Sequence, residues 1–108
     1  MGRRIGDAWV TDLTHFMDES GDLHAALAGP GRRLALHMTA IVAVATGGPI
    51  AGIRCRRRPD HRACAGTIAF RLWADQRITW GCPICGDNGV ISNWQATRWD
   101  HRAFVQAH

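Results

Sequence analysis

The sequence contains no lysine and no long apolar run. All 13 basic residues are arginine, so every positive charge is permanent and sits on a planar guanidinium that suits bidentate pairing with carboxylate or phosphate. No apolar stretch approaches the roughly 18 residues that a membrane-spanning helix needs. The first four residues lead into polar sequence instead of a signal-peptide core. We therefore expect a cytoplasmic protein without a membrane partner.

Motifs that carry enzymatic chemistry are missing as well. The chain has no Ser-His-Asp pattern, no glycine-rich phosphate loop and no His-Glu-x-x-His motif. Its six histidines, at positions 15, 24, 37, 61, 101 and 108, show no metal-ligand spacing. A zinc deaminase needs a His-x-Glu segment ahead of a Pro-Cys-x-x-Cys, and neither is present. The sequence therefore favours a binding protein over an enzyme.

The length and the charge distribution fit a single domain. A chain of 108 residues with 46% hydrophobic residues would leave each of two domains too little apolar surface to bury. Residues 1–30 carry two arginines against five acidic residues, a net charge of −3, whereas residues 31–108 carry eleven arginines against four aspartates, a net charge of +7. We expect one domain over 1–108, with a helical N-terminal part (1–46) and a second part (47–108).

Hydrophobic spacing predicts the main elements. Residues 30–46 begin with a proline suited to a first helical position and are followed by Gly47-Gly48. Their apolar spacing predicts an amphipathic helix. Residues 9–17 have shorter apolar spacing and predict one or two helical turns capped at Thr11 or Asp12. Residues 67–73 and 77–80 alternate around a turn and predict a β-hairpin, and residues 89–94 predict a further short strand. The helical face at 4, 3, 4 intervals consists of Leu34, Met38, Ile41 and Ala45.

Four cysteines form two pairs, Cys55-x8-Cys64 and Cys82-x2-Cys85, on either side of the predicted hairpin. A structural zinc site takes four soft ligands in a tetrahedron at ~2.3 Å from the metal, and two loops joined by a small sheet can provide them. The tight second pair is typical of a zinc knuckle, because Gly86 can take the positive φ of the following chain reversal. The spacing predicts a structural Zn²⁺ site with no open coordination position.

Other interpretations of the cysteines stay open at this point. They are disulfides, a thiol redox pair at Cys82 and Cys85, or ordinary buried thiols. His61, inside the wide first pair, could also replace Cys55 or Cys64 as a ligand.

Residues 82–100 read Cys-Pro-x-Cys-Gly-Asp-x-Gly-Val-Ile-x-x-Trp-x-x-Thr-x-Trp-Asp. This pattern resembles the tail of a group of small uncharacterised bacterial proteins that join a helical N-terminal part to a zinc ribbon, and the segment from Cys55 to Cys64 is similar to theirs. The resemblance covers about residues 50–100. It implies an α+β fold, with a small antiparallel zinc-ribbon sheet and an amphipathic helix from the N-terminal part, and no particular activity. The ligands that it implies are Cys55, Cys64, Cys82 and Cys85.

Five arginines lie within residues 54–62, the segment that we call the arginine loop. Metal ligation would anchor this loop, so its guanidiniums could lie along a phosphate backbone. Trp73, Trp80, Trp94 and Trp99 could add stacking surface for unpaired bases. The alternative for the arginines is that they are solvated or paired with carboxylates. The alternative for the tryptophans is that they belong to the core. The five residues are Arg54, Arg56, Arg57, Arg58 and Arg62.

A protein partner is the second hypothesis for the binding surface. The helix over 30–46 carries Leu36, Val42 and Val44 in addition to its main apolar face, and this surplus predicts a protein-interaction module or a homodimer. The opposite charges of the two ends would allow head-to-tail contact. The alternative is that the helix is the centre of the core. The sequence leaves nucleic acid and protein partners undecided.

Overall fold

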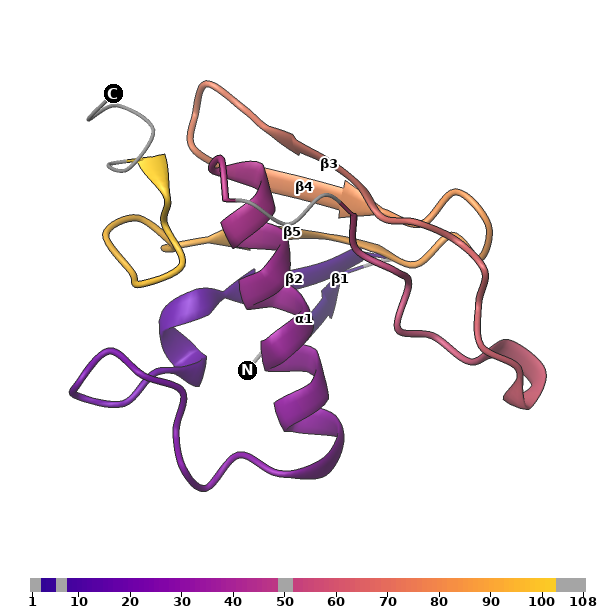
Figure 1. The fold of residues 1–108 in the computed structure, drawn as a ribbon, viewed down its shortest axis with the longest axis horizontal. Helices are drawn as coiled ribbons and strands as arrows, with labels where there is room; N and C mark the ends of the chain where they lie inside the picture. Colours follow the sequence, from indigo (N-terminus) through magenta and orange to yellow (C-terminus); the bar gives the residue numbers. More distant parts are fainter. Residues whose placement is uncertain (1–2, 6–7, 49–51, 103–108) are drawn as a thin grey trace.

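A five-stranded sheet forms the centre of the structure, and helix α1 (Gly29–Ala45) lies across one of its faces (Figure 1). The computed structural model describes residues 3–5, 8–48 and 52–102. The strand order is β1-β2-β5-β4-β3. The predicted α+β fold class is confirmed. The strands are β1 (Arg3–Ile5), β2 (Ala8–Asp12), β3 (Ala69–Leu72), β4 (Ile78–Gly81) and β5 (Asn88–Ser92).

The sheet is mixed, so the prediction of an antiparallel sheet is wrong for one strand pair. β2 runs parallel to β5, with Trp9 opposite Gly89 and Thr11 opposite Ile91. The pairs β1–β2, β4–β5 and β3–β4 are antiparallel. Parallel neighbours need a crossover connection, and here the long segment that contains α1 supplies it. The N-terminal part therefore contributes strands as well as a helix.

The helical turns predicted over residues 9–17 are largely wrong. Ala8–Asp12 forms β2, and only Leu13–Phe16 is helical, as the short 3-10 helix η1. Asp12 does cap this helix, because its side chain accepts a hydrogen bond from the Thr14 N–H at 3.0 Å. The aromatic and β-branched residues of β2 suit a pleated strand, and β5 offers that strand a hydrogen-bonding edge.

The helix predicted over residues 30–46 is confirmed as α1. Of the three surplus apolar residues, Val42 is buried, Val44 is half-buried and Leu36 is 49% exposed. The homodimer through this helix stays a prediction, and it now depends on Leu36. Within residues 8–48 and 52–102, no helix combines the length and apolar character that crossing a bilayer requires. The buried residues that α1 and the sheet contribute to one core include Leu34, Met38, Ile41, Val42, Ile78 and Ile91.

The tryptophans divide between the core and the surface. Trp80 and Trp94 are buried, and Trp99 is partly buried against the core. Trp73, just beyond β3, is 38% exposed. The interpretation as core residues therefore holds for Trp80 and Trp94, and Trp73 is the most open of the four.

Backbone pairing brings two cysteine-bearing segments to one end of the sheet. The predicted hairpin is confirmed as β3 and β4. Cys82 and Cys85 lie in the turn between β4 and β5, which pair antiparallel. Ahead of β3, the chain returns alongside itself after the arginine loop, and the Cys55 N–H donates to the Gly66 carbonyl at 2.9 Å. The fold thus places both cysteine pairs in one region.

Candidate metal centre

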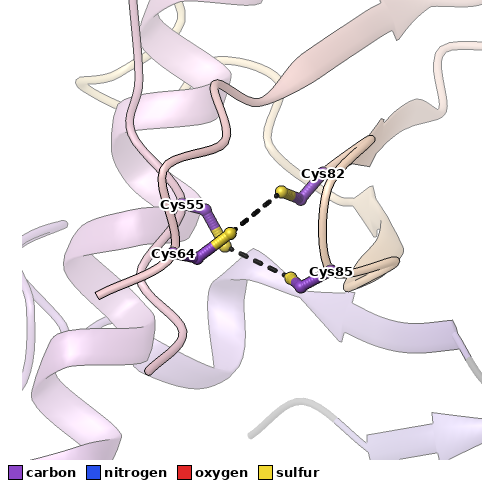
Figure 2. A group of neighbouring side chains, drawn as sticks. All are labelled: Cys55, Cys64, Cys82 and Cys85. Atoms are coloured by element: carbon purple, nitrogen blue, oxygen red, sulfur yellow. Dashed lines mark hydrogen bonds between the residues drawn. The ribbon is translucent and has the colours of Figure 1, made fainter. Parts of the chain in front are cut away.

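Four sulfur atoms meet at this end of the sheet (Figure 2). The Sγ atoms of Cys55, Cys64, Cys82 and Cys85 all lie within 4.8 Å of one another. Sγ of Cys55 lies 3.6 Å from Sγ of Cys85, and Sγ of Cys64 lies 3.6 Å from Sγ of Cys82. Sulfurs bound to one zinc ion at ~2.3 Å in a tetrahedron are about 3.8 Å apart. The four cysteines could therefore hold a metal ion.

The arrangement speaks against the disulfide interpretation. All four cysteines are free, and a disulfide bond would bring two sulfurs to about 2.05 Å. Each 3.6 Å separation is between a sulfur of the first pair and a sulfur of the second pair. The sulfurs therefore converge from two loops. Cys85 is exposed and the other three are buried, which places the cluster just beneath the surface.

The arginine loop is closed at its base by backbone hydrogen bonds. The Cys64 N–H donates to the Arg57 carbonyl at 2.9 Å. Two further N–H groups point at sulfur: that of Arg57 lies 3.5 Å from Cys55 Sγ, and that of Gly66 lies 3.4 Å from Cys64 Sγ. Such N–H donors stabilise a thiolate. Each sulfur of the wide first pair therefore faces the backbone N–H two residues further along, as in a zinc knuckle, although eight residues separate the two cysteines.

The second pair forms the predicted tight turn. The Gly86 N–H donates to the Cys82 carbonyl at 3.0 Å, and the Cys82 N–H donates to the Asp87 carbonyl at 2.8 Å. Gly86 has a φ of +80°, a conformation that glycine adopts without steric cost. The turn directs Cys82 and Cys85 toward the sulfurs of the first pair (Figure 2).

The thiols of the two pairs differ in acidity. Burial, together with the neighbouring thiols, raises the pKa of Cys55 to about 12. Burial alone would also raise the pKa of Cys82, but the N–H groups of Cys85 and Ile84 and the adjacent thiols lower it to about 7. Four thiolates this close repel one another strongly, whereas a bound divalent cation deprotonates its coordinating thiols. The site therefore favours a cation when all four sulfurs are deprotonated.

Gly66 is a site residue that the sequence analysis missed. A Cβ at this position would overlap Cys82 Sγ and would lie 3.2 Å from Ile84 Cγ1. The backbone of Gly66 also contacts both cysteines of the first pair, since its carbonyl accepts from the Cys55 N–H and its N–H points at Cys64 Sγ. The glycine two residues after Cys64 is the only sequence signal for this role.

Asp87 is the second residue that was missed. Its carboxylate is 2% exposed and lies 3.7 Å from a guanidinium nitrogen of Arg56 and 3.7 Å from one of Arg57. Its carbonyl meanwhile accepts from the Cys82 N–H. The side chain of Asp87 thus connects the Cys82–Cys85 turn to the arginine loop by charge, and its carbonyl helps to close that turn.

The remaining predicted residues divide into two groups. His61 is exposed at the tip of the loop and is not part of the sulfur cluster, so His61 is not needed to complete four ligands. Arg56, Arg57 and Arg58 line one cavity. Arg54 and Arg62 are exposed and do not line it.

The candidate centre is therefore four converging cysteines held by two backbone turns, with Gly66 packed against one sulfur and Asp87 behind the knuckle. Its interpretation depends on the chain's own residues. The sequence matches no protein-family model, and no curated protein and no solved structure matches it.

Proposed function

We propose that the chain is a non-catalytic zinc-binding module, in which a structural Zn²⁺ on Cys55, Cys64, Cys82 and Cys85 holds the arginine loop against nucleic acid. The observation that carries this proposal is the convergence of four sulfurs, all within 4.8 Å, from the two ends of the arginine loop and from the knuckle turn. A metal ion there would fix the base of the loop from both sides.

Zinc is the metal that this ligand set suits best. Four cysteine sulfurs are soft ligands, and tetrahedral sites of this composition are typical of structural zinc. A metal with four protein ligands has no open position for water or substrate, so the centre would stabilise the fold instead of performing chemistry. The resemblance to zinc-ribbon proteins supports the same assignment.

Nucleic acid is the partner that the charge of the arginine loop favours. Arg58 and Arg62 are exposed, whereas Arg56 and Arg57 share the charge of Asp87. Guanidiniums on a fixed loop contact phosphates with little loss of conformational entropy. The affinity would be largely independent of base sequence and would fall with salt.

A salt series with matched variants tests nucleic-acid binding. We expect the zinc-loaded protein to bind single- or double-stranded oligonucleotides, with a logarithmic affinity that falls linearly with the logarithm of salt concentration. The double variant Arg58→Gln/Arg62→Gln should lower the magnitude of this slope by about 1 to 2. Arg77→Gln is the control, because Arg77 is also exposed but pairs with Asp75 at 2.7 Å in the turn after β3. No binding at low salt would refute the nucleic-acid partner, and equal slopes for all three proteins would refute the arginine loop as the surface that contacts it.

Thiol redox chemistry is the second candidate function. Cys82, with a pKa of about 7, is partly thiolate at neutral pH, and Cys85 in the same turn is exposed. A redox protein would be isolated without metal and would form a Cys82–Cys85 disulfide on exchange with a disulfide substrate. Metal retained by all four cysteines, with no reactive thiol, would exclude this function.

A further inference from the structure

A cavity lies between the start of α1 and the arginine loop. Its volume is about 250 Å³, and apart from Pro30 every residue that lines it is an arginine. Arg33 comes from the second turn of α1, whereas the others come from the segment just after Cys55. Arg33 and the loop are distant in the sequence, so only the fold brings them together. The lining residues are Pro30, Arg33, Arg56, Arg57 and Arg58.

The positive charge around this cavity exceeds the negative charge beside it. Asp87 lies 3.7 Å from both Arg56 and Arg57, so these two guanidiniums share its carboxylate. Arg58 donates a hydrogen bond to the His61 carbonyl at 3.1 Å, a neutral acceptor that adds no negative charge. Within residues 8–48 and 52–102, no carboxylate lies within ion-pair distance of Arg33 or Arg58.

The start of α1 adds to this field. Ala28 at the N-cap provides no side-chain hydrogen bond, and the first turn contains no acidic residue. The N-terminal end of a helix carries a partial positive charge, which acidic side chains in the first turn would offset. Here Pro30, at the first turn, lines the arginine cavity. The helix end and the four guanidiniums therefore both favour an anionic ligand.

We infer that this cavity binds a phosphate dianion, either free inorganic phosphate or the terminal phosphate of a nucleic-acid strand. The inference rests on the proposed function in one respect, since the metal would hold the segment that carries three of the four arginines. Guanidinium forks match phosphate oxygens in bidentate geometry. A cavity of about 250 Å³ is smaller than the roughly 300–1,000 Å³ of sites that enclose whole small molecules, so it suits one phosphate group. The surplus of guanidiniums favours a dianion over the single charge of an internal phosphodiester.

Binding measurements on zinc-loaded protein with two matched variants test this site. Arg33→Gln removes a cavity arginine without changing the loop or the cysteines. Arg32→Gln removes the same charge from the neighbouring position of α1, which is exposed and does not line the cavity. The probes are inorganic phosphate and one oligonucleotide prepared with and without a 5′-phosphate. Circular dichroism and metal content should be the same for all three proteins.

We expect Arg33→Gln to weaken inorganic phosphate binding about tenfold or more, and Arg32→Gln to change it less than about threefold. A terminal phosphate that strengthens oligonucleotide binding in the wild type but not in Arg33→Gln identifies the strand end as a ligand. Phosphate binding without this advantage identifies free phosphate. The inference is overturned if the wild type does not bind phosphate, or if the two variants weaken it equally. The protein could instead bind no inorganic phosphate and bind the oligonucleotide equally well with and without the 5′-phosphate, in the wild type and in both variants. That result would refute this site and leave the nucleic-acid partner standing. Phosphate binding without any oligonucleotide binding would refute only the nucleic-acid partner.

Discussion

Gly66 lies against the sulfur of Cys82 so closely that a single added methyl group would overlap it. The two residues belong to different segments, one following the arginine loop and one opening the knuckle turn. Their contact fixes how near the two cysteine pairs approach. The metal centre therefore depends on the lack of a Cβ at Gly66 as well as on the four sulfurs.

Gly66→Ala should disturb both the metal centre and the fold. The added methyl group must displace Cys82 Sγ or Ile84, and overpacking of this kind costs about 1–3 kcal/mol of stability. We expect a lower melting temperature and faster loss of zinc to a chelator. Gly52→Ala is the control, because Gly52 lies just before the arginine loop and has nothing within 4 Å of its added Cβ. Equal behaviour of the two variants would show that the Gly66 contact does not shape the site.

The affinity for zinc should depend more steeply on pH below about pH 7 than above it. Zinc binds thiolates, so it displaces every proton that the metal-free thiols carry. Cys55, with a pKa raised to about 12, contributes a proton across the whole neutral range. Cys82, with a pKa of about 7, contributes one only at lower pH, which adds about a further factor of ten per pH unit. Apparent dissociation constants measured between pH 5.5 and 8.5 test this, and a constant slope would contradict it.

His37 should make the fold sensitive to acid. Burial, followed by the charge of Arg56, lowers its pKa to about 4, and its ring packs edge-on against Trp80 with centroids 5.5 Å apart. Its pKa in the unfolded chain is about 6.5, so protonation favours unfolding. The stability is fully present above pH 6.5 and is lost as the pH falls toward 4, by about 3 kcal/mol at most.

Unfolding free energies of the wild type and His37→Leu over this pH range isolate the effect. Acid release of zinc affects both proteins, so the difference between them reports His37. We expect that difference to shift in favour of His37→Leu as the pH falls. His24→Leu is the control, because His24 is exposed. A difference that does not change with pH would show that the buried imidazole does not titrate in this way.

The elements with strong local signals were predictable from the sequence. The period of α1, the alternation in β3 and β4, and the tight Cys82 turn each lie within one short segment. The pairing of β2 with β5 joins residues about 80 positions apart, and a five-residue strand with a weak pattern does not reveal a distant partner. Its aromatic and β-branched residues also fit a short helix by spacing alone, which explains the wrong prediction over residues 9–17.

The centre itself was predictable only in part. Cysteine spacing indicated four converging sulfurs, since two loops flanked a predicted hairpin. Gly66, Asp87 and Arg33 were missed because their roles arise from packing between segments. Gly66 matters through the space it leaves, Asp87 through a burial that the sequence does not show, and Arg33 through the position of α1 beside the loop.

Elemental analysis of the purified chain, beside Cys64→Ser, measures directly whether the four cysteines bind zinc. We expect one zinc ion per chain in the wild type and its loss in Cys64→Ser, because three thiolates and a hydroxyl are a poorer ligand set. A wild-type chain that contains no metal, takes up none when zinc is added, and keeps the same melting temperature with and without a chelator would contradict this expectation.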